Sequence, residues 1–289
     1  MAITYHAGRR LQGTSAEDGL ISHLKFNDNV TDSAGSNNGT VTGTTAYTTG
    51  KIDKAFSFNG SSYVKLANES NFDFEHTDPF SMSMWVYSTG SNQNVCLLGK
   101  GTTYFSQNGF YFICYNVGGN NVRFRWQIIS GGNNYEALGS TNVSSSTLYH
   151  FACTYDGSSN KNGLKIYMNG SLDATGSSNA ITGSMKNNEQ LTVGTNSSGQ
   201  TPASFWCDDF RMYNKTLSTD EISEIYNAGS GTESRFRLPT NVQTGSRYEE
   251  TDTRKMYHRD DIDFKEENGN EATNYRSASW YEQLSGETP

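Results

Sequence analysis

The stretch FSMSMWVY, residues 80–87, decides the fold class. Its residues alternate in character, so an extended chain would present a different set on each face. One face carries Phe80, Met82, Met84 and Val86. The other carries Ser81, Ser83, Trp85 and Tyr87. A period of two residues over this length predicts a half-buried strand of an antiparallel sheet.

The same alternation recurs downstream. In NVRFRWQII, residues 121–129, apolar residues share one face: Val122, Phe124, Trp126 and Ile128. The opposite face carries Arg123, Arg125 and Gln127. Further strand-like segments follow at short spacing, at residues 109–116, 148–155, 164–170, 190–194 and 205–213. Polar turns separate them, which favours a β-sandwich or a closed barrel because both leave few open edges.

Composition narrows the class further. Of the 289 residues, 34% are apolar and 12% are aromatic, whereas an average globular domain is roughly 45–50% apolar. This mix excludes a helical bundle, a coiled coil and a wholly disordered chain. The net charge of −8 gives no electrostatic basis for nucleic acid binding. No apolar run approaches the roughly 20 residues of a membrane helix, so we expect no membrane insertion.

Charge density divides the chain into three parts. Charged residues are more than twice as dense in residues 232–289 as in the residues before them. We therefore predict a main domain at 19–231, a charged tail at 232–289, and an N-terminal arm at 1–18 that carries Arg9 and Arg10. The first residues lack an apolar core, so we expect no ordinary secretory signal.

One helix is predicted near residues 218–227. Ser218 and Glu221 form a capping box, in which each side chain satisfies the backbone N–H of the other. Leu217, Ile222 and Ile225 are spaced to face a core, and Gly229 is a candidate for the helix end.

Residues 19–229 resemble the laminin G-like domain of the concanavalin A-like lectin/glucanase superfamily. Six segments carry the resemblance in the family's order: GLISHLKFNDNVTDSAGSNNGTVTG, GKIDKAFSFNGSSYVKL, FSMSMWVY, LYHFACTYDG, LKIYMNGSL and DDFRMYNKTLSTDEISEIYNAG. The resemblance implies an all-β fold, a two-sheet antiparallel jelly roll with one short helix. The sequence departs from the family at Cys207, where a Gly is common.

The resembled superfamily contains glycan binders, adhesion modules, hydrolase appendages and enzymes, so the fold does not decide the activity. Its catalytic members carry two glutamates on one strand, spaced to place both carboxylates on one face. This motif is absent from the sequence. The nearest carboxylates, Glu69, Asp73 and Glu75, lie in a loop-like stretch. We therefore predict that the protein is not an enzyme.

The resemblance also implies a structural Ca²⁺ ion that joins an Asp-Ser-x-Gly loop to an Asp-Asp pair. The corresponding residues are Asp32, with Asn29 or Asp28, and the pair Asp208 and Asp209. Ca²⁺ takes six to eight oxygen ligands, which carboxylates, amides and carbonyls supply. The alternative is that Asp32 caps a turn and that the Asp pair is solvated or bonded to the backbone.

Glycan contact would need an exposed aromatic ring beside amide or carboxylate groups. The candidate ligand-binding residues are Trp206, Tyr104, Tyr135, Asn133 and Asn134. The alternative is that these rings belong to the core or to a sheet edge.

The four cysteines, Cys96, Cys114, Cys153 and Cys207, show no metal-binding spacing. Cys114 and Cys153 lie in apolar strands, which is typical of buried small hydrophobes. A Cys96–Cys114 bridge between neighbouring strands is the alternative.

The tail contains TGSRYEETDTRKMYHRDDIDFKEENG, residues 244–269, which alternates around a turn at 252–255 and offers a third short strand at 262–266. It resembles the Glu-Thr-Asp-Thr hairpin of structural and fibre proteins of tailed viruses. A hairpin of this size is marginal alone and needs a partner surface. The alternative is a disordered acidic tail. The predicted assembly residues are Arg9, Arg10, Tyr248, Tyr257, Trp280 and Tyr281.

Two functions compete at this point. One is a virion structural protein, a head decoration, tail or fibre subunit, that displays the sandwich on the particle surface. Its expected partners are other virion subunits, further copies of itself in a homo-oligomer, and a surface glycan. The other is a secreted or cell-surface glycan-binding module. The expected lack of an export signal favours the virion, because virions assemble in the host cytoplasm and leave by lysis.

Overall fold

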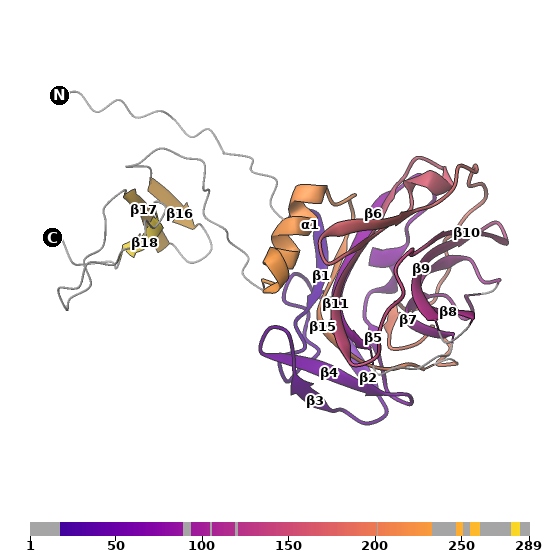
Figure 1. Cartoon of the computed structure of the whole chain (residues 1–289), viewed down its shortest axis with the longest axis horizontal. Coiled ribbons are helices and arrows are strands. Elements are labelled where there is room, and N and C mark those ends of the chain that lie inside the picture. The colour runs from indigo at the N-terminus through magenta and orange to yellow at the C-terminus, as the bar shows by residue number, and fades with distance from the viewer. Residues whose placement is uncertain are drawn as a thin grey trace. The chain divides into compact units, whose positions relative to one another are not determined.

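The computed structural model describes residues 18–88, 94–104, 106–118, 121–200 and 202–232, and the backbone of three strands between residues 247 and 283. The chain divides into two compact units. Residues 14–233 form one unit, which contains two large sheets and helix α1 (Figure 1). The second unit contains a three-stranded sheet.

The first unit is a two-sheet antiparallel sandwich, which confirms the predicted jelly-roll class. The eight strands of sheet A are β1 (Leu20–Leu24), β3 (Tyr47–Thr49), β4 (Lys54–Asn59), β6 (Pro79–Ser88), β11 (Thr147–Asp156), β12 (Lys165–Met168), β13 (Ser171–Thr175) and β15 (Ser204–Tyr213). The seven strands of sheet B are β2 (Gly39–Thr42), β5 (Tyr63–Leu66), β7 (Val95–Lys100), β8 (Gly109–Gly118), β9 (Asn121–Ser130), β10 (Asn133–Leu138) and β14 (Thr192–Val193).

The core lies between these two sheets and is rich in aromatic rings. The predicted inward residues of β6, from Phe80 to Val86, are at most 1% exposed. The Phe80 ring lies 5.0 Å from that of Phe110 and 5.7 Å from that of Trp126, between ring centroids. The alternation in 80–87 and 121–129 therefore correctly predicts which residues meet across the sandwich.

Helix α1 (Thr219–Tyr226) covers part of the outer face of sheet A, where Ile222 and Ile225 are fully buried (Figure 1). The predicted capping box is present, because Ser218 Oγ accepts from the Glu221 N–H and Glu221 Oε2 accepts from the Ser218 N–H. The helix ends at Tyr226, and Asn227 takes the left-handed conformation expected of Gly229. The described residues include no helix long and apolar enough to cross a membrane.

The helix explains one difference from the sequence prediction. The outward residues Ser81, Ser83 and Trp85 are at most 3% exposed, so most of β6 is buried on both faces. A period-two pattern identifies the inward face but cannot show that a distant helix covers the other face. Short 3₁₀ turns complete the unit at η1 (Glu69–Phe72), η2 (Lys161–Gly163) and η3 (Asn227–Gly229).

The second unit pairs β16 (Arg247–Glu250), β17 (Lys255–Asp260) and β18 (Ser279–Gln283) in one antiparallel sheet. The predicted hairpin is present, with Tyr248 opposite Tyr257. The third strand is β18, which contains Trp280 and Tyr281, whereas the predicted third strand at 262–266 lies outside the described residues. The N-terminal arm with Arg9 and Arg10 also lies outside them.

Candidate ligand-binding surfaces

A stacked aromatic pair lies on the outer face of sheet A. Trp206 of β15 is opposite Tyr87 of β6 in the strand register. Their ring centroids are 4.1 Å apart and the rings are within 13° of parallel. Both side chains are half-buried, whereas Phe205 and Cys207 on either side of Trp206 point into the core. Each ring thus covers one face of the other, and both rings stay partly open to solvent.

Neighbouring strands supply the rim of this surface. In the register, Ser57 of β4 is opposite Trp206, and Leu148 of β11 is opposite Tyr87. Both are half-buried. The sequence analysis identified Trp206 but missed Tyr87. The signal was present, because Tyr87 is the last outward residue of FSMSMWVY, yet only the strand register shows that it reaches Trp206.

Two other predicted rings are not exposed. Tyr104 is 3% exposed, and its hydroxyl donates to the Asn94 carbonyl at 3.2 Å. Tyr135 is 4% exposed and belongs to the main core, because the alternation of β10 points it inward. Their proposed role as exposed ligand-binding rings is therefore wrong, and the alternative, that they are covered or core aromatics, holds for both. Asn133 and Asn134 beside Tyr135 are exposed as predicted.

Tyr104 instead packs on the outer face of sheet B and covers part of it; we call it the Tyr104 cover. It packs with a second, smaller apolar cluster of Cys96, Tyr111, Ile113 and Ile129. Its backbone carbonyl accepts from Gln127 Nε2 at 2.6 Å. A predicted ligand-binding residue thus seals part of the sheet from solvent.

Beyond this cover, Arg125 of β9 lies on the same outer face in a fixed position. Its guanidinium carbon lies 4.1 Å from the ring centroid of Tyr115, and its Nη1 donates to Glu136 Oε2 at 3.1 Å. Asn134 Nδ2 lies 3.5 Å from the same carboxylate oxygen. Arg125 is only 7% exposed, whereas Asn134 is exposed. The sequence placed Arg125 on the outer face but gave no sign of these partners.

The aspartates of the predicted calcium site lie around one histidine. His23 of β1 donates its backbone N–H to Asp32 Oδ1 at 2.8 Å. Its Nε2 lies 2.6 Å from Asp209 Oδ1. Arg211 Nε and Nη2 each lie 3.1 Å from that same oxygen. The structure thus links Asp32 to Asp209 through His23 rather than directly.

Burial and charge shift the pKa values of this group. His23, Asp209 and Arg211 are each at most 1% exposed. Burial lowers the pKa of His23 despite the nearby Asp209. Burial acts to raise the pKa of Asp209, but Arg211 and His23 outweigh it and hold that pKa below its usual value. Burial acts to lower the pKa of Arg211, but Asp209 keeps it raised. The ion pair of Asp209 and Arg211 is therefore charged at neutral pH.

These contacts do not fit a Ca²⁺ ion that needs six to eight oxygens. Asp32 also accepts the N–H groups of Ala34 and Asn37. Asp208 accepts those of Lys51 and Ile52. Asp209 faces a guanidinium, Asn29 Oδ1 accepts from Thr31, and Asp28 pairs with Lys54. Within the part of the chain that the structure describes, no three His, Cys, Asp or Glu residues form a metal cluster. Calcium binding stays a prediction.

The carboxylates nearest to a catalytic motif are already paired. The buried ammonium of Lys100 lies 3.1 Å from Glu69 Oε2 and 2.8 Å from Asp73 Oδ1. It also donates to the carbonyls of Asn187 and Glu189. This lysine therefore holds the η1 turn against the loop that precedes β14.

The third carboxylate of that stretch, Glu75, is fixed separately. Its Oε1 accepts from Ser184 Oγ and its Oε2 accepts from the Met185 N–H. It thus ties the stretch after η1 to the loop at residues 184–185.

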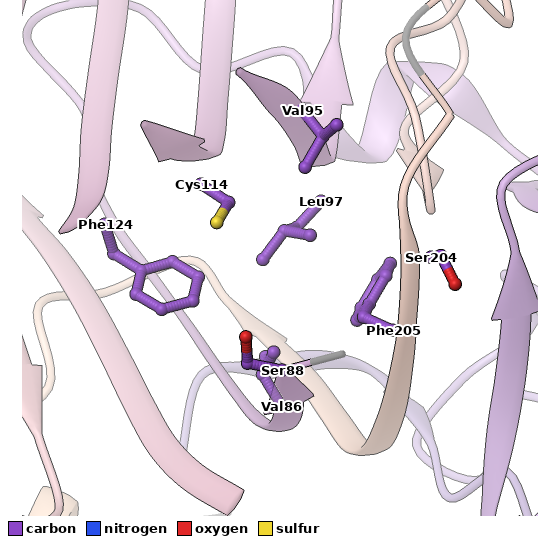
Figure 2. A pocket seen from close by; sticks show the side chains of 8 residues that line it. All are labelled: Val86, Ser88, Val95, Leu97, Cys114, Phe124, Ser204 and Phe205. Carbon is purple, nitrogen blue, oxygen red and sulfur yellow. The ribbon is translucent and has the colours of Figure 1, made fainter. Parts of the chain in front are cut away.

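A small apolar pocket opens between the sheets. Figure 2 shows the side chains of Val95, Leu97, Cys114, Phe124 and Phe205 around a common space, with Ser88 and Ser204 beside it. This lining suits no sugar, because it offers two hydroxyls and otherwise apolar surface. Cys114 is a free, buried thiol, as are Cys96, Cys153 and Cys207. Burial raises the pKa of Cys114 to about 12.

Comparison with known proteins identifies the family. A family model described as the concanavalin A-like lectin/glucanases superfamily matches residues 58–223, which is more than half of the chain. The chain belongs to this superfamily. No curated protein matches the sequence.

Solved structures share the fold at low identity. Domain 4 of AbnA, a GH43 extracellular arabinanase from Geobacillus stearothermophilus, solved with arabinotriose, is 22% identical with a TM-score of 0.54. The match covers 71% of this chain and 97% of that one. The binding domain of Paraclostridial Mosquitocidal Protein 1 is 16% identical with a TM-score of 0.56, over 74% of this chain and 53% of that one.

A third similar structure is the ligand-binding domain of botulinum neurotoxin serotype D, solved with N-acetylneuraminic acid. It is 16% identical with a TM-score of 0.55, over 74% of this chain and 52% of that one. This chain therefore spans nearly all of the arabinanase domain but only about half of each toxin domain.

Proposed function

We propose that this member of the concanavalin A-like superfamily is a non-catalytic glycan-binding protein that displays its sandwich on the surface of a virus particle. The observation that carries the glycan-binding role is the stacked pair of Trp206 and Tyr87. Aromatic rings that are partly open to water bury the apolar face of a ligand while its polar edge stays solvated. The half-buried Ser57 beside the pair supplies a hydroxyl at the rim.

The contacts of the three candidate carboxylates, Glu69, Asp73 and Glu75, support the absence of catalysis. A glycosidase needs one carboxyl group to donate a proton and a second one to act as nucleophile or base. Glu69 and Asp73 both lie within ion-pair distance of Lys100, and Glu75 is bonded to Ser184 and Met185. One ammonium thus engages both carboxylates, and they are not placed on either side of a space that a sugar could enter.

A particle-associated role is supported by the second unit. The three-stranded sheet places Tyr248 opposite Tyr257, and it pairs β17 with the strand that carries Trp280 and Tyr281. Three short strands are close to the lower limit of independent stability, so this sheet is suited to docking on a neighbouring subunit. The alternative is a secreted or cell-surface glycan-binding module, which the similarity to a domain of an extracellular arabinanase favours.

The glycan-binding role is tested with full-length Trp206→Ala and Tyr87→Ala on an array that includes arabinotriose and N-acetylneuraminic acid. We expect both variants to lose about tenfold or more in affinity, because truncating an aromatic anchor of a binding site typically costs about 2 kcal/mol or more. Tyr63→Ala is the matched control, since Tyr63 is a half-buried tyrosine on sheet B. Equal binding by all three variants and the wild type would contradict the assignment.

The location is tested separately by electron microscopy of particles labelled with an antibody against the sandwich. Label on the particle surface that is lost when residues 232–289 are deleted supports the virion role. Full-length protein found only outside particles, with unchanged glycan binding, supports the secreted or cell-surface alternative.

A further inference from the structure

One buried lysine lies among four oxygen atoms but has only three hydrogens to donate. Lys100 Nζ donates to Glu69 Oε2 at 3.1 Å and to the carbonyls of Asn187 and Glu189 at 3.2 and 2.8 Å. The fourth oxygen, Asp73 Oδ1, lies 2.8 Å from the same nitrogen. It is buried and accepts no hydrogen bond among the described residues. Since an ammonium has three N–H groups, the other three oxygens use all of them.

A second lysine shows the ordinary arrangement. Lys215 Nζ also lies close to two carboxylates, and it donates to both, to Asp18 Oδ2 at 3.1 Å and to Glu221 Oε1 at 2.6 Å. Its side chain is 22% exposed, whereas that of Lys100 is 2% exposed. The contact between Lys100 and Asp73 therefore differs from the Lys215 pairs in its burial and in its lack of a hydrogen bond.

Both ends of this contact are held in place by the fold. Asp73 follows η1, and its N–H donates to the Ser70 carbonyl at 3.3 Å. Its neighbours Phe72 and Phe74 are buried in the main core. Lys100 is the last residue of β7 and is paired with β8 in the sheet. The nitrogen and the carboxyl group are thus kept close together, which is how a protein favours a bond-forming step between two of its own groups.

We propose that Lys100 Nζ and Asp73 Cγ form an isopeptide bond, with Glu69 as the carrier of the protons. Only a neutral amine attacks a carboxyl group, and removal from water is one way in which proteins activate a lysine for such chemistry. Glu69 is placed to take the ammonium proton, because its Oε2 already accepts a hydrogen bond from Nζ. The cross-link goes beyond the proposed function, since it involves no residue of the Trp206 surface.

The reaction is balanced within these three side chains. Glu69 takes one proton from the ammonium and passes it to the Asp73 carboxylate. The lone pair of the neutral Lys100 Nζ then attacks Cγ of the protonated carboxyl group, and a C–N bond forms. Glu69 moves a second proton from the nitrogen to the departing hydroxyl, so the C–O bond breaks and one water leaves. The products are a neutral amide and an unchanged Glu69 carboxylate, and no other reactant is needed.

The bond connects the turn after η1 to the end of β7 and closes a covalent ring through residues 73–100. The amide keeps one N–H, which stays close to the Glu189 carbonyl that Nζ already contacts. Like a disulfide, a cross-link of this kind stabilises a fold mainly by restricting the unfolded chain. These two segments of the domain therefore stay joined even when the rest of it unfolds.

The mass of the intact, full-length protein tests the proposal. We expect the wild type to weigh one water molecule less than its sequence, and its digest to contain a branched peptide in which Lys100 is joined to Asp73. Lys100→Arg should restore the full mass, because a guanidinium does not form this amide. Lys215→Arg is the matched control and should keep the deficit. Glu69→Gln should leave most of the protein at full mass, because it removes the proton carrier.

Asp73→Asn gives a second readout that does not depend on losing the bond. An amide side chain at this position would release ammonia in place of water, so the deficit should change from one water to one ammonia. Each variant is checked for a cooperative thermal transition, and Asp73→Ala serves as the unlinked form if Lys100→Arg does not fold.

Three results would overturn the proposal. The first is a wild-type chain that keeps its full mass after days of incubation in the folded state at neutral pH. The second is a deficit of one water that persists in folded Lys100→Arg or Asp73→Ala. The third is a branched peptide whose fragments place the cross-link at other residues.

Discussion

Helix α1 covers part of the outer face of sheet A, whereas a single tyrosine, Tyr104, covers part of that of sheet B. Beside the helix lie buried charges, of which Asp209 and Arg211 are at most 1% exposed. On sheet B, the charged residue Arg125 lies at the edge of the cover and keeps one unpartnered donor among the described residues. Asp209 Oδ2 on sheet A is likewise without a partner among the described residues, so the two faces differ in which segments their charged residues connect.

The charged residues on the two faces are expected to differ in how much they stabilise the fold. The charged cluster on sheet A connects distant segments, since Asp209 lies within hydrogen-bond distance of His23 and Arg211 donates to the Thr232 carbonyl. On the outer face of sheet B, Arg125 connects neighbouring strands through Glu136. We expect substitutions in the first group to change the free energy of unfolding most, and those in the second to change it little.

The largest expected effect is that of Arg211→Met. It leaves the Asp209 carboxylate buried without its main counter-charge, which typically costs about 3–5 kcal/mol. Urea unfolding of the full chain measures the loss. Arg123→Met on sheet B is the control and should change the free energy of unfolding by no more than about 0.5 kcal/mol. Similar losses in the two variants would remove the distinction between the faces.

A smaller effect is expected from acid. Burial lowers the pKa of His150 on sheet A to about 3, so the folded protein keeps this ring neutral while the unfolded chain protonates it below about 6.5. The contribution of His150 to the free energy of unfolding is thus complete above pH 6.5, and it is lost as the pH falls towards 3. Between pH 7 and pH 5 the expected loss is about 2 kcal/mol.

His150→Phe tests that assignment, because it keeps a ring between Trp85 and Tyr226 but cannot be protonated. The slope of the free energy of unfolding against pH should become shallower in this variant. Part of the slope should remain, because burial also lowers the pKa of His23. An unchanged slope would show that the acid sensitivity arises elsewhere.

On sheet B, Tyr104→Phe removes one hydrogen bond from the hydroxyl to the Asn94 carbonyl. Because Asn94 is exposed, water can replace the lost donor, and we expect a loss of only about 0.5–1.5 kcal/mol. Thermal unfolding measures it. A loss as large as that of Arg211→Met would mean that the tyrosine cover contributes as much as the buried charges do.

The sequence predicted the fold well because its signals are local. Alternation in 80–87 identifies the core face, and the capping box at Ser218 identifies the helix start. Both signals depend on residues within a few positions of each other, so no tertiary information is needed. The helix end differed because Asn227 adopts the left-handed conformation two residues before Gly229.

The sites were predicted less well because they depend on register and on covering segments. Trp206 was identified from its residue type, but its partner Tyr87 lies on a strand more than a hundred residues away in the chain. Tyr104 and Tyr135 have the same residue type, yet one is a cover and the other a core residue. No spacing in the sequence distinguishes these three environments.

Calcium gives the smallest expected effect and tests the sequence prediction that the structure leaves open. An ion that binds only the folded chain raises the melting temperature with its concentration. To bind through Asp32 it would have to replace the N–H groups of His23, Ala34 and Asn37, and at Asp209 it would compete with Arg211. We therefore expect the full chain to melt within about 1 °C of the same temperature in EDTA and in excess Ca²⁺. A larger rise that Asp32→Asn removes, and that Asp53→Asn at an exposed position does not, would establish the ion. It would also mean that the Asp32 loop gives up its backbone hydrogen bonds when the ion binds.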